Sequence, residues 1–105
     1  MKVFKYTLHP DPPSTGIDVM LPVGARVLSV GIQGDRIVCW ALVSGRSYND
    51  QPPAPRRFVV MPTGAVSAEE LDRMRFVGTV QFKPRVIGAS EFVFHVFTEI
   101  VEEMP

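Results

Sequence analysis

The sequence predicts a mainly β domain of the α+β kind: an antiparallel β-sandwich or open barrel of about seven strands with one short helix. Three observations predict it. Apolar and polar residues alternate in several short segments, a Gly-Asp pair separates two long apolar runs, and segments rich in Pro and Gly lie between the others. The 105 residues form a single domain, 1–105, which buries roughly 65% of its unfolded surface and needs no disulfide or metal to fold.

The first strand is predicted in "KVFKYTL", where Phe4, Tyr6 and Leu8 alternate with Lys5 and Thr7. The segment "HPDPPSTG" after it cannot be regular structure, because its prolines remove backbone donors and fix φ. A short second strand follows in "IDVML" and ends at the turn "PVGA".

The strongest local signal is the hairpin in "ARVLSVGIQGDRIVCWALV". Gly34 and Asp35 are its expected central residues, and glycine supplies the positive φ of a type II′ turn. The expected pairs are Gln33 with Arg36, Ile32 with Ile37, Val30 with Cys39, and Leu28 with Ala41. On the other face Ser29 lies opposite Trp40, and Gly31 leaves room for the indole. Both faces are apolar, which predicts a central hairpin covered on both sides by a second layer or a partner chain.

Three more strands are expected in "RFVVM", "RFVGTVQF" and "EFVFHVFTEIV". Alternation places Phe76, Val80 and Phe82 on one face, and sets Phe92, Phe94, Val96 and Ile100 against Val93, His95, Phe97 and Glu99. The helix is expected in "SAEELDRM", where the spacing of Ser67 and Glu70 matches a capping box.

An anion site is one reading of "RRFVVMPTGAVSAEE", because strand, glycine turn and helix start are the layout that cradles phosphate. It would use Arg56, Arg57, Thr63 and Gly64, since guanidinium groups suit carboxylate and phosphate. The stretch is not a P-loop, because it has one glycine and no lysine. The alternative is a plain turn from strand to helix.

No motif for catalysis, metal or cofactor binding is found. With two histidines and one cysteine in the chain, no spacing resembles a zinc site. Cys39 is expected to be a small buried hydrophobe. Trp40 and Phe97 are expected in the core, and His95 is expected to be a half-buried, hydrogen-bonded ring rather than a general base. Alternatively, all three lie on a surface for an oligomer or partner.

Charge and hydropathy exclude several classes. Eleven basic residues balance eleven acidic ones, which argues against non-specific nucleic-acid binding. No apolar run approaches the length of a membrane span, and the N-terminus has no signal-peptide pattern. The expectation is a soluble cytoplasmic protein, without membrane contact, that forms a homo-oligomer.

The blocks "MKVFKYTL", "LPVGARVLSV", "CWALV", "RRFVVMPTG", "FVGTVQF" and "FVFHVF" resemble a family of small proteins of tailed bacteriophages, a domain of unknown function. Relatives tend to carry a histidine after the Thr-Gly pair, where this chain has Ala65. The resemblance implies a non-catalytic phage accessory protein that binds a host protein in the host cytoplasm. The alternatives are a protein that sequesters a small anionic ligand such as a nucleotide immune signal, a minor virion component, and an enzyme without a recognisable motif.

Overall fold

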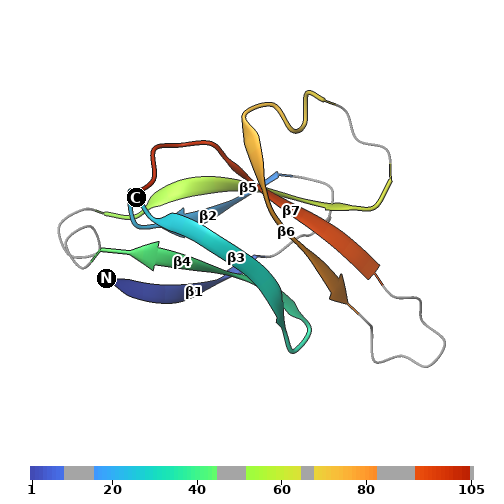
Figure 1. The fold of residues 1–105 in the computed structure, drawn as a ribbon, viewed down its shortest axis with the longest axis horizontal. Coiled ribbons are helices and arrows are strands. Elements are labelled where there is room, and N and C mark those ends of the chain that lie inside the picture. Colours follow the sequence, from blue (N-terminus) through green and yellow to red (C-terminus); the bar gives the residue numbers. More distant parts are fainter. Residues whose placement is uncertain (9–15, 45–51, 65–67, 83–91, 105) are drawn as a thin grey trace.

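The fold consists of seven β-strands in a computed structural model that describes residues 1–8, 16–44, 52–64, 68–82 and 92–104 (Figure 1). All seven expected strands are confirmed. They are β1 (Lys2–Leu8), β2 (Gly16–Leu21), β3 (Arg26–Gln33), β4 (Arg36–Val43), β5 (Ala54–Pro62), β6 (Met74–Phe82) and β7 (Phe92–Glu99).

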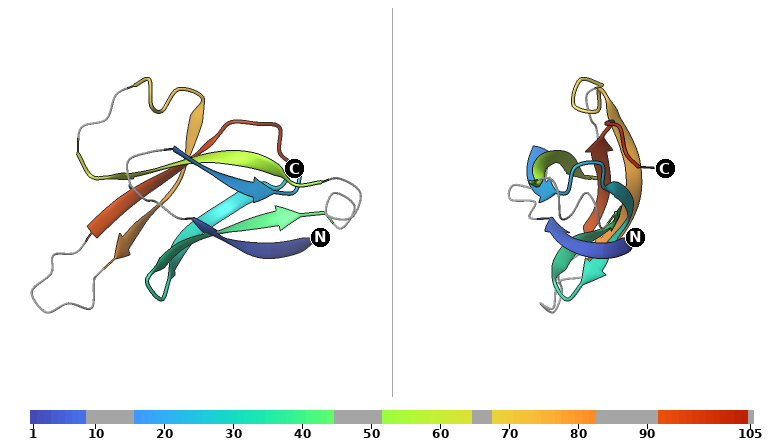
Figure 2. Two further views of the ribbon diagram at one scale, coloured as in Figure 1. Left: turned by 180° about the vertical axis from the view of Figure 1, so that it is seen from behind. Right: turned by 90° about the vertical axis from the view of Figure 1, so that its left-hand side faces the viewer.

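The described strands form two antiparallel sheets that face each other as an open sandwich and not as a closed barrel (Figure 2). One sheet has the order β1-β4-β3, and the other has the order β2-β5-β7-β6. The order of strands in the sheets therefore differs from their order in the sequence. β1 and β3 belong to the three-stranded sheet, whereas β2, which lies between them in the sequence, pairs with β5 in the other sheet.

The core lies between the two sheets and is built from the inward side of each strand. Its largest fully buried apolar side chains are Phe58, Leu8, Leu21, Val43, Val60 and Val96. Phe4 and Tyr6 pack against this core from β1, while Lys5 is exposed, as the alternation in that strand predicts.

The β3–β4 hairpin is confirmed around Gly34, which has a φ of 64°. The predicted pairs hold from Gln33 to Ser29, and a bulge between Val27 and Ser29 then shifts the register by one residue. The predicted pairing of Leu28 with Ala41 is wrong, because Val27 takes that place and is 3% exposed while Leu28 is 41% exposed. The hairpin is central only in part, since β4 has a neighbour on each side but β3 lies at the edge.

A second bulge, between Phe76 and Gly78 in β6, also corrects a prediction. Phe76 pairs with Phe97 and is 55% exposed, so it does not share a face with the buried Val80. The residue inside the bulge, Val77, packs against the core instead. In β7 the expected alternation holds for Phe94 and Val96, which face the core, and for His95 and Phe97, which lie on the other side. Ile100, expected on the face of Phe94, lies beyond the end of the strand and is 61% exposed.

The predicted helix is wrong over residues 68–73, which form consecutive turns. The amide of Leu71 donates to the carbonyl oxygen of Ala68, and that of Asp72 donates to Glu69, both at 3.3 Å and both spanning three residues. Arg73 then has a φ of 58°, which ends any right-handed helical path. So short a segment gains too few bonds to offset helix nucleation. The expected N-cap, Ser67, lies outside the described residues.

The edge strands β3 and β6 approach each other without pairing. A Cβ atom on Gly78 would lie 2.9 Å from Cγ2 of Val30, so only glycine permits this approach. Nη2 of Arg75 on β6 donates to the carbonyl oxygen of Val27 on β3 at 2.9 Å. The side chain of Arg75 thus links the edges of the two sheets at a place where backbone hydrogen bonds between β3 and β6 would have closed a barrel.

Candidate functional site

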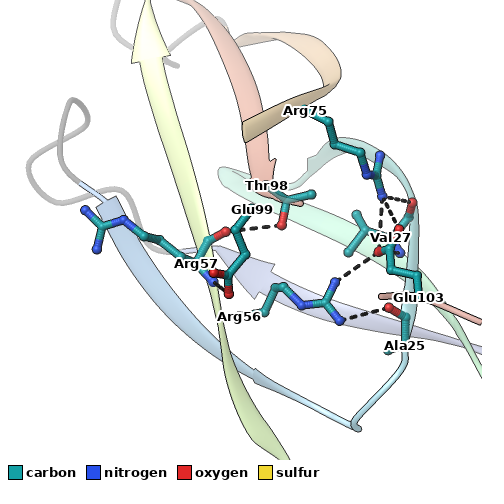
Figure 3. Close-up of polar contacts among 8 residues, drawn as sticks. All are labelled: Ala25, Val27, Arg56, Arg57, Arg75, Thr98, Glu99 and Glu103. Carbon is teal, nitrogen blue, oxygen red and sulfur yellow. Dashed lines mark hydrogen bonds and ion pairs between the residues drawn. The ribbon is translucent and has the colours of Figure 1, made fainter. Parts of the chain in front are cut away.

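Arg56 and Arg57, adjacent in β5, point away from each other (Figure 3). Successive residues of a strand face opposite sides of its sheet. Arg56 faces the core side and is 5% exposed, whereas Arg57 is exposed on the outer side. The two arginines therefore cannot converge on one small anion.

The buried Arg56 belongs to an internal network around Glu103, here called the Glu103 clamp: Arg56, Arg75, the backbone of Val27, and the carboxylate of Glu103 (Figure 3). Nη1 of Arg56 and the amide of Val27 both donate to Oε2 of Glu103 at 3.0 Å. Nη2 of Arg75 donates to both carboxylate oxygens, at 3.0 and 3.2 Å. Nη2 of Arg56 also donates to the carbonyl oxygen of Ala25 at 3.0 Å.

The Glu103 clamp also protects an exposed sheet edge. The amide and carbonyl of Val27 point away from the hairpin, and Glu103 and Arg75 satisfy them in place of a neighbouring strand. Unpaired edge groups are a template for aggregation, which such charged side chains prevent. The hydrogen bonds of Arg56 thus have a structural role within the domain.

Arg57 has an exposed side chain. Its backbone amide donates to Oε1 of Glu99 at 3.0 Å, and its side chain extends over the start of β2 (Figure 3). There it lies against Gly16, in the space that any Cβ on that residue would occupy. Among the residues that the structure describes, no acidic side chain pairs with this guanidinium.

Beside Arg57, the outer face of the four-stranded sheet carries an aromatic row, defined as Gly16, Val59, Phe97 and Phe76. The strand register places these four residues side by side across β2, β5, β7 and β6. Phe76 is 55% exposed, Phe97 is half-buried, and Val59 is only 4% exposed. The rings of Phe76 and Phe97 pack edge to face with centroids 5.5 Å apart. Because the guanidinium of Arg57 covers Gly16, one row joins a cation at one edge to the pair of exposed Phe76 and half-buried Phe97 at the other.

Next to the aromatic row, His95 is held between two threonines. Its Nε2 lies 2.9 Å from Oγ1 of Thr63, and its Nδ1 lies 2.9 Å from Oγ1 of Thr79. A neutral imidazole has one N–H, so one hydroxyl accepts from the ring and the other donates to it. The ring is fixed in orientation, as a hydrogen-bonded surface histidine.

The remaining predicted site residues do not join this surface as one site. Thr63 lies six residues beyond Arg57, roughly 20 Å along an extended chain, so the two cannot hold one small anion between them. Gly64 is exposed, and nothing lies within 4 Å of a Cβ built on it. Trp40 lies on the other sheet, where it covers Gly31.

The domain family described as "Domain of unknown function (DUF7352)" matches residues 1–105. The chain belongs to this family. No curated protein and no solved structure matches it. The description of DUF7352 assigns no chemistry.

The buried thiol of this DUF7352 chain is a core residue, as expected. Cys39 is 0% exposed, and burial raises the pKa of its thiol from 9.0 to about 11, with a smaller opposing effect from the charge of Arg56. The described part of the chain holds no group of three or more His, Cys, Asp or Glu that could bind a metal ion. It also contains no helix long and apolar enough to cross a membrane.

Two features of the site were not predicted from the sequence. Phe76 was expected on the same face as Val80, because a bulge has no reliable local signal. Glu103 is one acidic residue in a tail without periodicity, and only the folded chain brings it to Arg56. The separation of Arg56 from Arg57, in contrast, follows from strand alternation and was available from the sequence.

Proposed function

We propose that this protein acts without catalysis, by binding another protein through the outer face of the β2-β5-β7-β6 sheet. One observation carries the proposal: the guanidinium of Arg57, which pairs with no acidic side chain among the described residues, lies in one row with the exposed Phe76 and the half-buried Phe97. Arginine and aromatic side chains are the groups most enriched at protein interfaces and at their energetic centres.

The chemistry of the row defines the partner. Phe76 offers apolar area to an apolar side chain, and Arg57 offers a planar cation to a carboxylate. The row spans three strand spacings, roughly 14 Å, which suits a protein surface better than a small anion. His95 and its threonines border the row with groups that can donate and accept hydrogen bonds.

The resemblance to tailed-phage proteins supplies the context. A small phage accessory protein that binds without catalysis has its partner in the infected cell. The partner we propose is therefore a host protein with an acidic group beside an apolar anchor, met in the host cytoplasm.

The test is recovery of a partner from host lysate by tagged protein, after nuclease treatment and at moderate salt. Phe76→Ser and Arg57→Ala should each lose the partner while keeping the far-ultraviolet circular dichroism of the fold. Val3→Ser is the matched control, because Val3 is a comparably exposed apolar residue, at 53%, in the other sheet. A partner retained equally by all three variants would refute the proposal.

Arg57→Ala also has a quantitative expectation. Loss of a hydrogen bond to a charged group weakens binding by about 1.5 to 3 kcal/mol, roughly 10- to 150-fold. The free energy of unfolding should change by less than about 0.5 kcal/mol, because the side chain is exposed. Titration of the recovered partner, beside a denaturant curve, measures both quantities.

A second candidate is sequestration of a small anionic ligand such as a nucleotide. The observation that favours it is the same row, where an aromatic pair could stack a base while Arg57 contacts phosphate. Mass spectrometry of small molecules released when the lysate-treated protein is denatured separates the two. A released nucleotide without a protein partner would select this candidate.

A further inference from the structure

The two sides of the sandwich differ in how their sheet edges are joined. At one side β3 and β6 are linked, because Nη2 of Arg75 donates to the carbonyl oxygen of Val27. At the other side the edge strands are β1 and β2. A groove of about 430 Å³ lies there, lined by Thr7 of β1 and by residues 17–20 of β2. Its volume is within the range of ligand-binding pockets, about 300 to 1,000 Å³.

The strand β2 presents an unpaired backbone edge to this groove. It pairs with β5 on one side, and no other hydrogen bond to its backbone occurs among the residues that the structure describes. In an antiparallel pair, the N–H and C=O groups of every second residue point away from the neighbouring strand. Part of the groove wall is therefore a row of backbone donors and acceptors, which is the surface that an extended peptide recognises.

Of the four edge strands in the described sheets, β2 is the one without a protective feature. β3 has a bulge and the Glu103 clamp, β6 has a bulge, and β1 carries Lys2 and Lys5. Bulges, lysines and prolines are the usual features that keep an edge from pairing. The sequence GIDVML of β2 contains no lysine and no proline, and its register with β5 is unbroken. The fold thus leaves this edge available to a further strand.

Two charges lie on the outer face at this edge. The guanidinium of Arg57 reaches across the start of β2 and lies against Gly16 (Figure 3). Two residues further along, Asp18 is exposed, and no basic side chain pairs with it in the described part of the chain. Gly16 and Asp18 share one face because side chains alternate along a strand, whereas Ile17 packs against the core. A strand added beside β2 would meet a cation, an apolar side chain and an anion at three successive positions.

We infer that the partner adds an extended strand to the open edge of β2 and lengthens the four-stranded sheet by one strand. This strand runs antiparallel to β2, as the strand pairs of the domain do. From its N-terminus it carries a basic residue opposite Asp18, an apolar residue opposite Ile17 that faces the groove, and an acidic residue opposite Gly16 that meets Arg57. Main-chain hydrogen bonds supply the affinity of such a complex, and alternate side chains supply its specificity. The inference rests on the proposed function, because it names the segment of the partner that carries the acidic group.

The experiment uses the full chain and two synthetic peptides with blocked termini. The first is Ser-Thr-Val-Lys-Val-Glu-Thr-Ser, and in the second the lysine and the glutamate change places. Residue-resolved amide hydrogen exchange should show slower exchange at alternate residues of β2 when the first peptide binds, and no change in β3. Titration should give an affinity for the second peptide that is weaker by at least about five-fold, because both cross-strand charge pairs become repulsive.

An exchange of charge on the protein tests the register. In Asp18→Lys one charge pair is reversed and the other is kept, so the preference between the two peptides should disappear. Asp35→Lys is the matched control, because Asp35 is an exposed aspartate in the hairpin of the other sheet, and it should keep the preference. The inference is overturned if neither peptide slows exchange in β2 at millimolar concentration, or if the unmodified protein binds both peptides equally.

Failure of this inference can be told from failure of the proposed function. Phe76 lies on β6, at the opposite edge of the sheet from β2, so Phe76→Ser should lose the partner recovered from lysate and keep the first peptide. A lysate partner that Phe76→Ser loses, without any peptide pairing at β2, would refute the strand addition alone. Peptide pairing at β2 without a lysate partner would refute the proposed function and leave the strand addition standing.

Discussion

Arg56 and Glu103, 47 residues apart in the sequence, meet with Nη1 and Oε2 at 3.0 Å and with both side chains almost excluded from solvent. Neither charge would be stable there alone, because a buried ion without its partner loses its hydration and gains no compensating electrostatic attraction. The contact therefore ties the C-terminal tail to the core side of β5 and to the edge of β3.

Glu103→Gln should lower the free energy of unfolding by about 3 kcal/mol, the lower end of the range for breaking a buried ion pair, because glutamine keeps one acceptor oxygen. Glu102→Gln changes the exposed neighbour and should shift it by less than about 0.5 kcal/mol. Denaturant unfolding of the two variants measures the difference. Equal midpoints would show that the clamp contributes no stability.

Gly16→Ala should weaken partner binding without removing any contact group. Its Cβ would occupy the place of the Arg57 guanidinium, and a flexible arginine tip can move aside at little cost in stability. The expected outcome is a native denaturant midpoint with a partner affinity close to that of Arg57→Ala. If affinity is unchanged, the position of Arg57 over Gly16 has no role in recognition.

Cys39 should make stability fall at high pH. Its pKa is about 11 in the folded protein and 9.0 as its ordinary value, so the unfolded chain loses the thiol proton first as pH rises. The contribution is present below pH 9 and is lost between 9 and 11, by about 2 to 3 kcal/mol. Urea midpoints at both ends of this window, compared with Cys39→Ala, measure it; the alanine variant should lack this part of the decline.

Gly31→Ala should displace the only tryptophan of the chain. The new Cβ would lie 3.0 Å from Cζ3 and 3.1 Å from Cη2 of Trp40, so the indole must move. We expect a shifted fluorescence maximum and a loss of about 1 to 3 kcal/mol in unfolding free energy. Gly34→Ala strains the turn at φ 64° but meets no atom within 4 Å, and it should leave the emission unchanged.

Local patterns predicted the strands well because each depends on neighbours in sequence. The contact of Gly31 with Trp40 follows from hairpin register in the same way and is confirmed. The two bulges are different, since one extra residue reverses the faces of everything beyond it. That reversal exposes Leu28 and brings Phe76 to the outer face.

The candidate site was less accessible from sequence. Strand alternation would have separated Arg56 from Arg57, but nothing local indicates that Glu103 fills the space beside Arg56. His95 was correctly expected to be hydrogen-bonded, while its partners Thr63 and Thr79 lie on two other parts of the chain. Contacts of this kind depend on which strands become neighbours, and that is decided by packing of the whole domain.

The place of β2 in the far sheet governs how the chain can fold. Lys2 pairs with Val43 and Gly16 with Val59, so each sheet needs a partner that is synthesised some forty residues later. Of the strand pairs that the structure describes, only β3–β4 and β6–β7 join strands that follow each other in the sequence. The chain must lose the entropy of closing these long loops before the strand contacts form. We therefore expect a folding time in the millisecond to second range that is typical of β-sandwiches. On the ribosome, β2 emerges before β5 exists, and it stays an unpaired strand until residues 54–62 have followed.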